Sequence, residues 1–139
     1  MTAATALSPW QDCIAHCWEC RTECQKVFFS HCLEEGGKHV EKDHVLILMD
    51  CIAICQTAAD SMVRGSPVHA AICAAAASIC EACAESCDAI DTETMRRLGA
   101  ICRACAKSCH EMATGAKESI AAQLSKSLPN PLEQFHSHT

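Results

Sequence analysis

Small and apolar residues recur along this chain at intervals of three, four and seven positions, which is the period of an amphipathic helix. No stretch alternates between apolar and polar residues, so we predict no strands. Turn residues divide the helical pattern into four segments. The predicted helices cover residues 8–35, 40–63, 67–89 and 92–127, and an irregular tail follows at 128–139.

The boundaries between these segments are marked by residues that start or stop helices. Ser8 and Pro9 are typical of a helix start, and Gly36 ends the first segment. Gly65 closes the second segment and Pro67 opens the third. Connections of about two to four residues favour antiparallel neighbours. We therefore predict one all-α domain over residues 1–139, folded as an up-down-up-down antiparallel four-helix bundle.

The composition shows that the interior of this bundle differs from an ordinary core. Leu, Ile, Val and Phe together supply only 25 of 139 residues, whereas the chain has 23 alanines and 14 cysteines. Globular domains normally contain more of the large apolar residues than this. A core of methyl groups and thiols buries less apolar area per residue, so we expect a further interaction to stabilise it.

The cysteines lie on one face of each predicted helix. From Cys13 to Cys24 the spacings are four, three and four, which keep the four thiols on one side of the first helix. Bundle helices place their core residues at such positions, so we predict a core lined with sulfur. The candidate metal ligands are the fourteen thiols of Cys13, Cys17, Cys20, Cys24, Cys32, Cys51, Cys55, Cys73, Cys80, Cys83, Cys87, Cys102, Cys105 and Cys109.

Three explanations compete for this lining: disulfides, a purely apolar role and metal binding. Cysteines three or four residues apart on one helix point side by side, and closing them strains the preferred disulfide geometry. Bridges between helices remain open under oxidising conditions. A purely apolar role is compatible with buried cysteine in general, but it does not explain regular spacing on four segments. Metal binding explains both the number and the spacing.

The charge of the ligands favours one metal over another. Four thiolates around Zn²⁺ carry a formal charge of −2, and several such sites in a bundle core would be costly to desolvate. Cu(I) accepts two or three thiolates, and bridging sulfurs bring metal and thiolate close to one to one, which is neutral. The sequence therefore favours multiple Cu(I) ions, on the order of 14 if one accompanies each thiolate. Alanines beside the cysteines leave room for them.

Four motifs carry a family resemblance: CIAHCWECRTEC at 13–24, CIAIC at 51–55, CEACAESC at 80–87 and CRACAKSC at 102–109. With them, the chain resembles the bacterial cytosolic four-helix-bundle copper storage proteins over about residues 8–127. The resemblance implies intracellular storage of many Cu(I) ions, assembly as a homotetramer and no catalysis, with a copper chaperone as candidate donor. Only two thiols fall on the second predicted helix, which departs from the fullest pattern and affects the expected load.

Methionines and histidines extend the cysteine stripes toward both ends of the predicted bundle. Thioethers and imidazoles are suitable relay ligands for Cu(I). We take one end as the preferred ion entrance and the other as a weaker candidate. The preferred end gathers Met62, His69 and Met112, with His110 and Asp60 nearby, and the weaker end gathers His31, His44 and Met95. We expect His16, His39, His136 and His138 at the surface.

The net charge and the composition of the chain indicate which partners and which cell compartment to expect. A net charge of −6 does not suit nucleic acid, and the absence of an apolar run of 18 residues gives no reason to expect a membrane span. The segment MTAATALSPWQD lacks the features of a secretory signal, so we expect a cytoplasmic protein with reduced thiols. An Fe–S redox protein and a zinc-thiolate buffer remain the alternatives. The chain lacks the short cysteine loop of ferredoxins.

Overall fold

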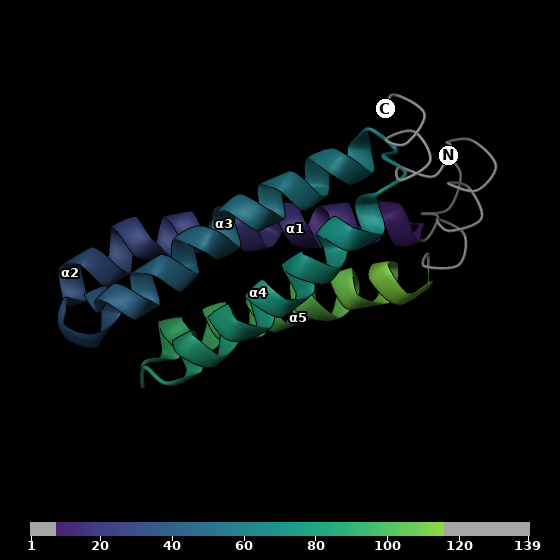
Figure 1. Ribbon diagram of the computed structural model, residues 1–139. Coiled ribbons are helices and arrows are strands. Elements are labelled where there is room, and N and C mark those ends of the chain that lie inside the picture. The colour runs from purple at the N-terminus through teal and green to yellow at the C-terminus, as the bar shows by residue number, and fades with distance from the viewer. Residues whose placement is uncertain (1–7, 116–139) are drawn as a thin grey trace, which may run out of the picture.

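The computed structural model describes residues 8–115 and shows four helical segments packed side by side (Figure 1). The first segment joins three elements: α1, a π-helical turn and the short α2. A 3-10 turn then leads into α3. The elements are α1 (Pro9–Val27), the π-helical turn (Phe28–Cys32), α2 (Leu33–Glu35), the 3-10 turn (Gly37–Val40), α3 (Lys42–Val63), α4 (His69–Asp88) and α5 (Glu93–Gly115).

These elements form the predicted four-helix bundle. In it α1 packs against α3 and α5, and α4 packs against the same two helices, so the four segments surround one core. Successive segments run in opposite directions (Figure 1). No residue within 8–115 belongs to a strand. The predicted helix beyond residue 115 and the predicted irregular tail at 128–139 lie outside the described residues.

The start of α1 has the cap that Ser8 and Pro9 predicted. The Oγ of Ser8 accepts a hydrogen bond from the backbone N–H of Gln11 at 3.2 Å. The Gln11 side chain in turn accepts from the Ser8 backbone N–H at 3.1 Å, which completes a capping box. At the far ends of α2 and α3, Gly36 and Gly65 both have φ of 66°, a left-handed conformation that favours glycine. Cap and turn residues therefore set the lengths of the helices.

The π-helical turn changes which residue faces the core at the end of the first segment. Cys32 lies eight positions after Cys24, and in a regular α-helix a seven-residue step would keep the stripe better aligned. A π turn accommodates one extra residue through its i to i+5 hydrogen bonding. Cys32 is consequently fully buried, whereas His31, which the regular spacing placed on the stripe, is only half-buried. The predicted stripe position of His31 was wrong for this reason.

Two opposite ends of the bundle can now be defined. The α2 end contains α2, the 3-10 turn, the start of α3 and the turn between α4 and α5 (Figure 1). The His69 end contains the start of α1, the turn between α3 and α4, and the last described turn of α5. Ordinary aliphatic packing is concentrated toward the α2 end, where Val27, Leu48, Ile90 and Leu98 are buried.

Within the described residues, α3 and α4 are long and apolar enough to cross a membrane by length and composition alone. Both helices carry buried cysteines that pack against the other helices of the bundle. Core helices of soluble proteins satisfy the same criterion, so it is weak evidence for a membrane role.

Candidate metal centre

All fourteen cysteine side chains are fully buried, and all are free thiols. They project inward from α1, the π-helical turn, α3, α4 and α5. The disulfide explanation therefore does not describe this structure, and the predicted cysteine-lined core is confirmed. Alanines at inward positions, such as Ala58, Ala76 and Ala84, are buried between the thiols.

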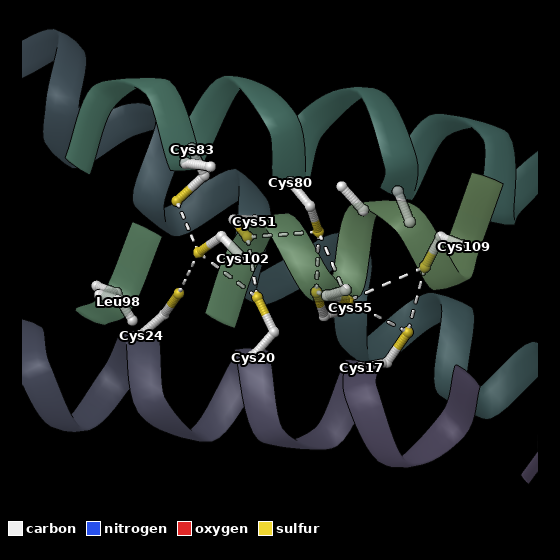
Figure 2. Close-up of a cluster of buried hydrophobic side chains, with 14 of the residues drawn as sticks. Cys17, Cys20, Cys24, Cys51, Cys55, Cys80, Cys83, Leu98, Cys102 and Cys109 are labelled. Atoms are coloured by element: carbon white, nitrogen blue, oxygen red, sulfur yellow. Dashed lines mark hydrogen bonds between the residues drawn. The ribbon is translucent and has the colours of Figure 1, made fainter. Parts of the chain in front are cut away.

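The sulfur atoms form a continuous network along the bundle axis. The closest Sγ–Sγ distance is 3.5 Å, between Cys55 and Cys80, and the longest of the network is 4.0 Å, between Cys105 and Cys109. Figure 2 shows these sulfur atoms meeting between the helices. The network passes through Cys13, Cys109, Cys17, Cys105, Cys55, Cys80, Cys51, Cys20 and Cys102, where it branches to Cys24 and Cys83.

Four groups of thiols are compact enough to hold a metal ion, because their sulfur atoms all lie within 4.8 Å of one another. The groups overlap: Cys20 belongs to both tetrads, and Cys102 belongs to one tetrad and one triad. The groups are Cys20, Cys24, Cys51 and Cys102; Cys20, Cys55, Cys80 and Cys105; Cys13, Cys17 and Cys109; and Cys83, Cys87 and Cys102.

This overlap determines what the core can bind. With metal–sulfur bonds of about 2.3 Å, as for zinc thiolates, two sulfurs on opposite sides of one ion lie at most about 4.6 Å apart. The observed spacing of 3.5 to 4.0 Å falls within that limit. An isolated structural zinc site has four ligands, whereas the two thiol tetrads here share Cys20. Shared sulfurs suit a cluster in which one thiolate binds two neighbouring metal ions.

The electrostatics of the core also favour univalent ions. No lysine, arginine, aspartate or glutamate is buried within residues 8–115, so the protein supplies no fixed charge to balance thiolates. Burial, followed by the charge of Cys87, raises the pKa of Cys32 to about 11, which favours its neutral thiol. A thiolate core is therefore stable only with bound cations, and one univalent cation per thiolate makes it neutral.

The His69 end places three of the four predicted accessory ligands inside the bundle. Met62, His69 and Met112 are 3%, 4% and 6% exposed. The imidazole of His69 lies against Trp10 with ring centroids 4.1 Å apart and the ring planes tilted by 46°, and its Nδ1 donates to the carbonyl oxygen of Ser66 at 2.9 Å. Its Nε2 is buried without a hydrogen-bond partner in the described part of the chain. The role of these three residues as ligands stays a prediction.

His110 lies differently from the other predicted ligands. It is exposed and lines a groove on the outer face between α4 and α5, together with Ala77, Glu81 and Arg103. The structure therefore does not bring His110 to the thiols, although it follows Cys109 directly in sequence. A residue next to an inward cysteine points about 100° away on an α-helix, which explains its position.

The α2 end contains two candidate ligands that the sequence placed there, Met95 and His44, and a third, His39, that it did not. Met95 is fully buried, with its Sδ 3.8 Å from the Sγ of Cys32. His44 is buried, and so is His39 at 8% exposure, so the expectation of a surface His39 was wrong. The 3-10 turn after Gly36 folds His39 back under the bundle, and its Nδ1 donates to the Gly36 carbonyl at 3.2 Å. The adjacent glycines were the available sequence signal for this turn.

Fold and site together define a helical-bundle protein whose core can bind many soft metal ions. The chain belongs to the copper storage protein family, whose model matches residues 7–114. No curated protein matches the chain significantly.

Solved structures support the family assignment. A protein from Nitrosospira multiformis is 42% identical, with a TM-score of 0.73, and the match covers 76% of this chain and 95% of that one. The Cu(I)-bound copper storage protein BsCsp3 is 33% identical, with a TM-score of 0.70 and coverage of 76% and 99%. Apo-Csp3 from Bacillus subtilis is 32% identical, with a TM-score of 0.65 and coverage of 73% and 96%.

Proposed function

We propose that this chain stores copper in the cytosol by binding many Cu(I) ions to the thiolates inside its bundle. The continuous sulfur network carries this proposal, because eleven of the fourteen thiols form one connected, branched network with spacings of 3.5 to 4.0 Å. Each ion takes two or three sulfurs, and each sulfur serves neighbouring ions. The expected load is on the order of 14 ions per chain.

Charge balance explains how such a load can be held. An empty core contains neutral thiols, and each bound Cu(I) replaces about one proton, because the ligating thiol must lose it. The net charge of the core therefore stays near zero during filling. The Cu(I)-bound relative BsCsp3, at 33% identity, supports copper as the ion stored here.

Copper storage by this chain also requires a compartment, an assembly and a donor of copper. We place it in the cytosol, because free thiols persist in reducing compartments. The proposed assembly is a homotetramer, and exposed apolar side chains such as Trp18, Phe29, Leu46 and Val63 would contribute to contacts between copies. The proposed role is storage without catalysis, with a copper chaperone as donor. Light scattering coupled to gel filtration would measure the mass of the assembly.

The function is tested by counting the ions that the chain binds. Reduced protein is titrated with Cu(I) under anaerobic conditions against a competing chelator, and metal content is measured independently. We expect ten or more equivalents per chain, roughly one for each thiolate. A variant with all fourteen cysteines changed to Ser should keep a helical circular dichroism spectrum and lose bulk uptake.

A matched control places new serines on the outside of the bundle. Changing the exposed alanines Ala53, Ala71, Ala74, Ala75, Ala100 and Ala104 to Ser should leave uptake intact. Uptake of many ions by the variant without cysteines would overturn the proposal. Preferential, tight binding of Zn²⁺ in competition with Cu(I) would replace copper storage by zinc buffering.

A further inference from the structure

The α2 end of the bundle holds three histidines outside the sulfur network. His39 and His44 are 8% and 6% exposed. His31 is half-buried and lies edge-on against His39, with ring centroids 4.9 Å apart. The three residues come from the π-helical turn, the 3-10 turn and α3. They therefore gather where the chain reverses direction between its first two long helical segments.

Each of the three imidazoles has a buried nitrogen atom without a partner. The Nε2 atoms of His31, His39 and His44 make no hydrogen bond to any residue within 8–115. A buried polar atom normally finds a partner, because leaving it unpaired costs free energy. Three unpaired nitrogens at one end of the fold thus indicate a ligand. Among the described residues no three ligand atoms that include an imidazole nitrogen lie within 4.8 Å of one another, so the imidazoles are successive ligands and do not make one closed site.

The other ring nitrogens are held in a way that suits metal binding. Nδ1 of His39 donates to the Gly36 carbonyl oxygen at 3.2 Å, so a neutral ring carries its lone pair on Nε2. Nδ1 of His44 lies 2.7 Å from the Oγ of Ser86, which orients that ring. Metal-binding histidines usually have their second nitrogen fixed in this way.

His44 also connects these histidines to the thiols. Its partner Ser86 precedes Cys87 in α4, and the sulfur of Cys87 lies within 4.8 Å of those of Cys83 and Cys102. Cys102 is a branching point of the sulfur network. His44 therefore contacts the turn of α4 that carries Cys87, the thiol of that helix closest in sequence to the α2 end.

Few side chains at the α2 end could connect the histidines to the sulfur network. Leu48 and Leu98 are fully buried and offer no ligand atom. Cys32 contacts Met95 at 3.8 Å, and within the described residues it makes no hydrogen-bond contact with another thiol. Cys87 is therefore the thiol that joins the histidines to the network.

We propose that His31, His39 and His44 line an entry site, where the imidazoles bind incoming Cu(I) one after another and pass it to Cys87. The transfer is a ligand exchange: a Cu–N bond to His44 breaks, a Cu–S bond to Cys87 forms, and copper stays in the +1 state. The thiol proton leaves to the vacated Nε2 or to water. This inference rests on the proposed storage function and adds a second entrance to the one predicted at the His69 end.

The test separates the rate of loading from the final load. Anaerobic protein is mixed with a Cu(I)–chelator complex, and the near-ultraviolet absorbance of copper thiolates is followed in time. The variant His39→Gln/His44→Gln is compared with His16→Gln, which alters a partly exposed histidine paired with Asp12 at 3.7 Å. In a His69→Gln background, we expect the double variant to load about tenfold more slowly, with an unchanged final load. Loading at the rate of the His16→Gln control would overturn the proposal.

A second variant tests the connection to the core. Cys87→Ala should slow loading by a similar factor, and combining it with the two histidine changes should slow it no further. If the combined variant instead loads more slowly than either parent variant, by the product of their two factors, transfer through Cys87 is contradicted. A third measurement needs no substitution: Cu(I) is added to fully loaded, ¹⁵N-histidine-labelled protein, and the Nε2 resonances of the three histidines should shift. Unshifted resonances would overturn the entry site, whereas a low load in the unmodified chain would instead overturn storage.

Discussion

The middle of the bundle and its two ends are built from different chemistry. In the middle, thiols from every long helix contact one another, and no imidazole or thioether of residues 8–115 takes part in these contacts. At the ends, thiols become sparse, and buried histidines and methionines take their place. The contrast indicates that holding ions and admitting them place different demands on the ligands. Shared thiolates retain Cu(I), whereas neutral nitrogen and thioether ligands bind it without adding charge.

The two ends also differ from each other. At the α2 end, the large aliphatic side chains of Leu48 and Leu98 are fully buried. At the His69 end, Ala58 and Ala76 are the buried neighbours of the thiols, and no large aliphatic side chain within residues 8–115 is buried there apart from Met62 and Met112. Apolar stabilisation is therefore concentrated at the α2 end.

The largest expected effect comes from breaking the middle of the network. Cys20 and Cys105 each contact several thiols, whereas Cys32 and Cys73 lie toward the ends. If each central thiolate bridges two ions, Cys20→Ser/Cys105→Ser should lose about four ions and Cys32→Ser/Cys73→Ser about two. Metal content after chelator competition measures both. Equal losses would show that the middle and the ends store copper alike.

Stability should respond most to the aliphatic side chains of the α2 end. Leu48→Ala removes a fully buried side chain and should lower the free energy of unfolding of the empty protein by about 3 kcal/mol. Leu33→Ala, at a position 50% exposed, is the matched control and should change it by less than about 0.5 kcal/mol. Urea denaturation followed by circular dichroism makes the comparison. Similar losses for the two variants would contradict the uneven distribution of packing.

A smaller effect is expected at the His69 end, where the first helix begins. Ser8→Ala removes the cap of α1 and should cost about 1 kcal/mol of stability. Ser78→Ala, at an exposed position within α4, makes the same chemical change without a cap and should have almost no effect. The shift in thermal midpoint measures both. A destabilisation by Ser8→Ala as large as that by Leu48→Ala would place more of the stability at this end than the packing indicates.

The fold and the thiol lining could be predicted because they depend on local and periodic signals. Caps, left-handed glycines and three- or four-residue spacing determine helix ends and faces within a few neighbouring residues. The burial of His39 was missed because it depends on how the turn after Gly36 packs under the bundle. Likewise, His110 was included for its proximity in sequence to Cys109, although helical geometry turns it outward.

The π-helical turn at Phe28–Cys32 has a consequence for how the chain tolerates a change of length. Deleting Ser30 would put Cys32 seven positions after Cys24, and an ordinary α-helix would then present the same thiol to the same neighbours. The extra residue is therefore dispensable for the thiol lining. Its effect falls on the opposite side of the turn, where it rotates His31 toward His39. A shortened chain would keep its capacity and change only the surroundings of that imidazole.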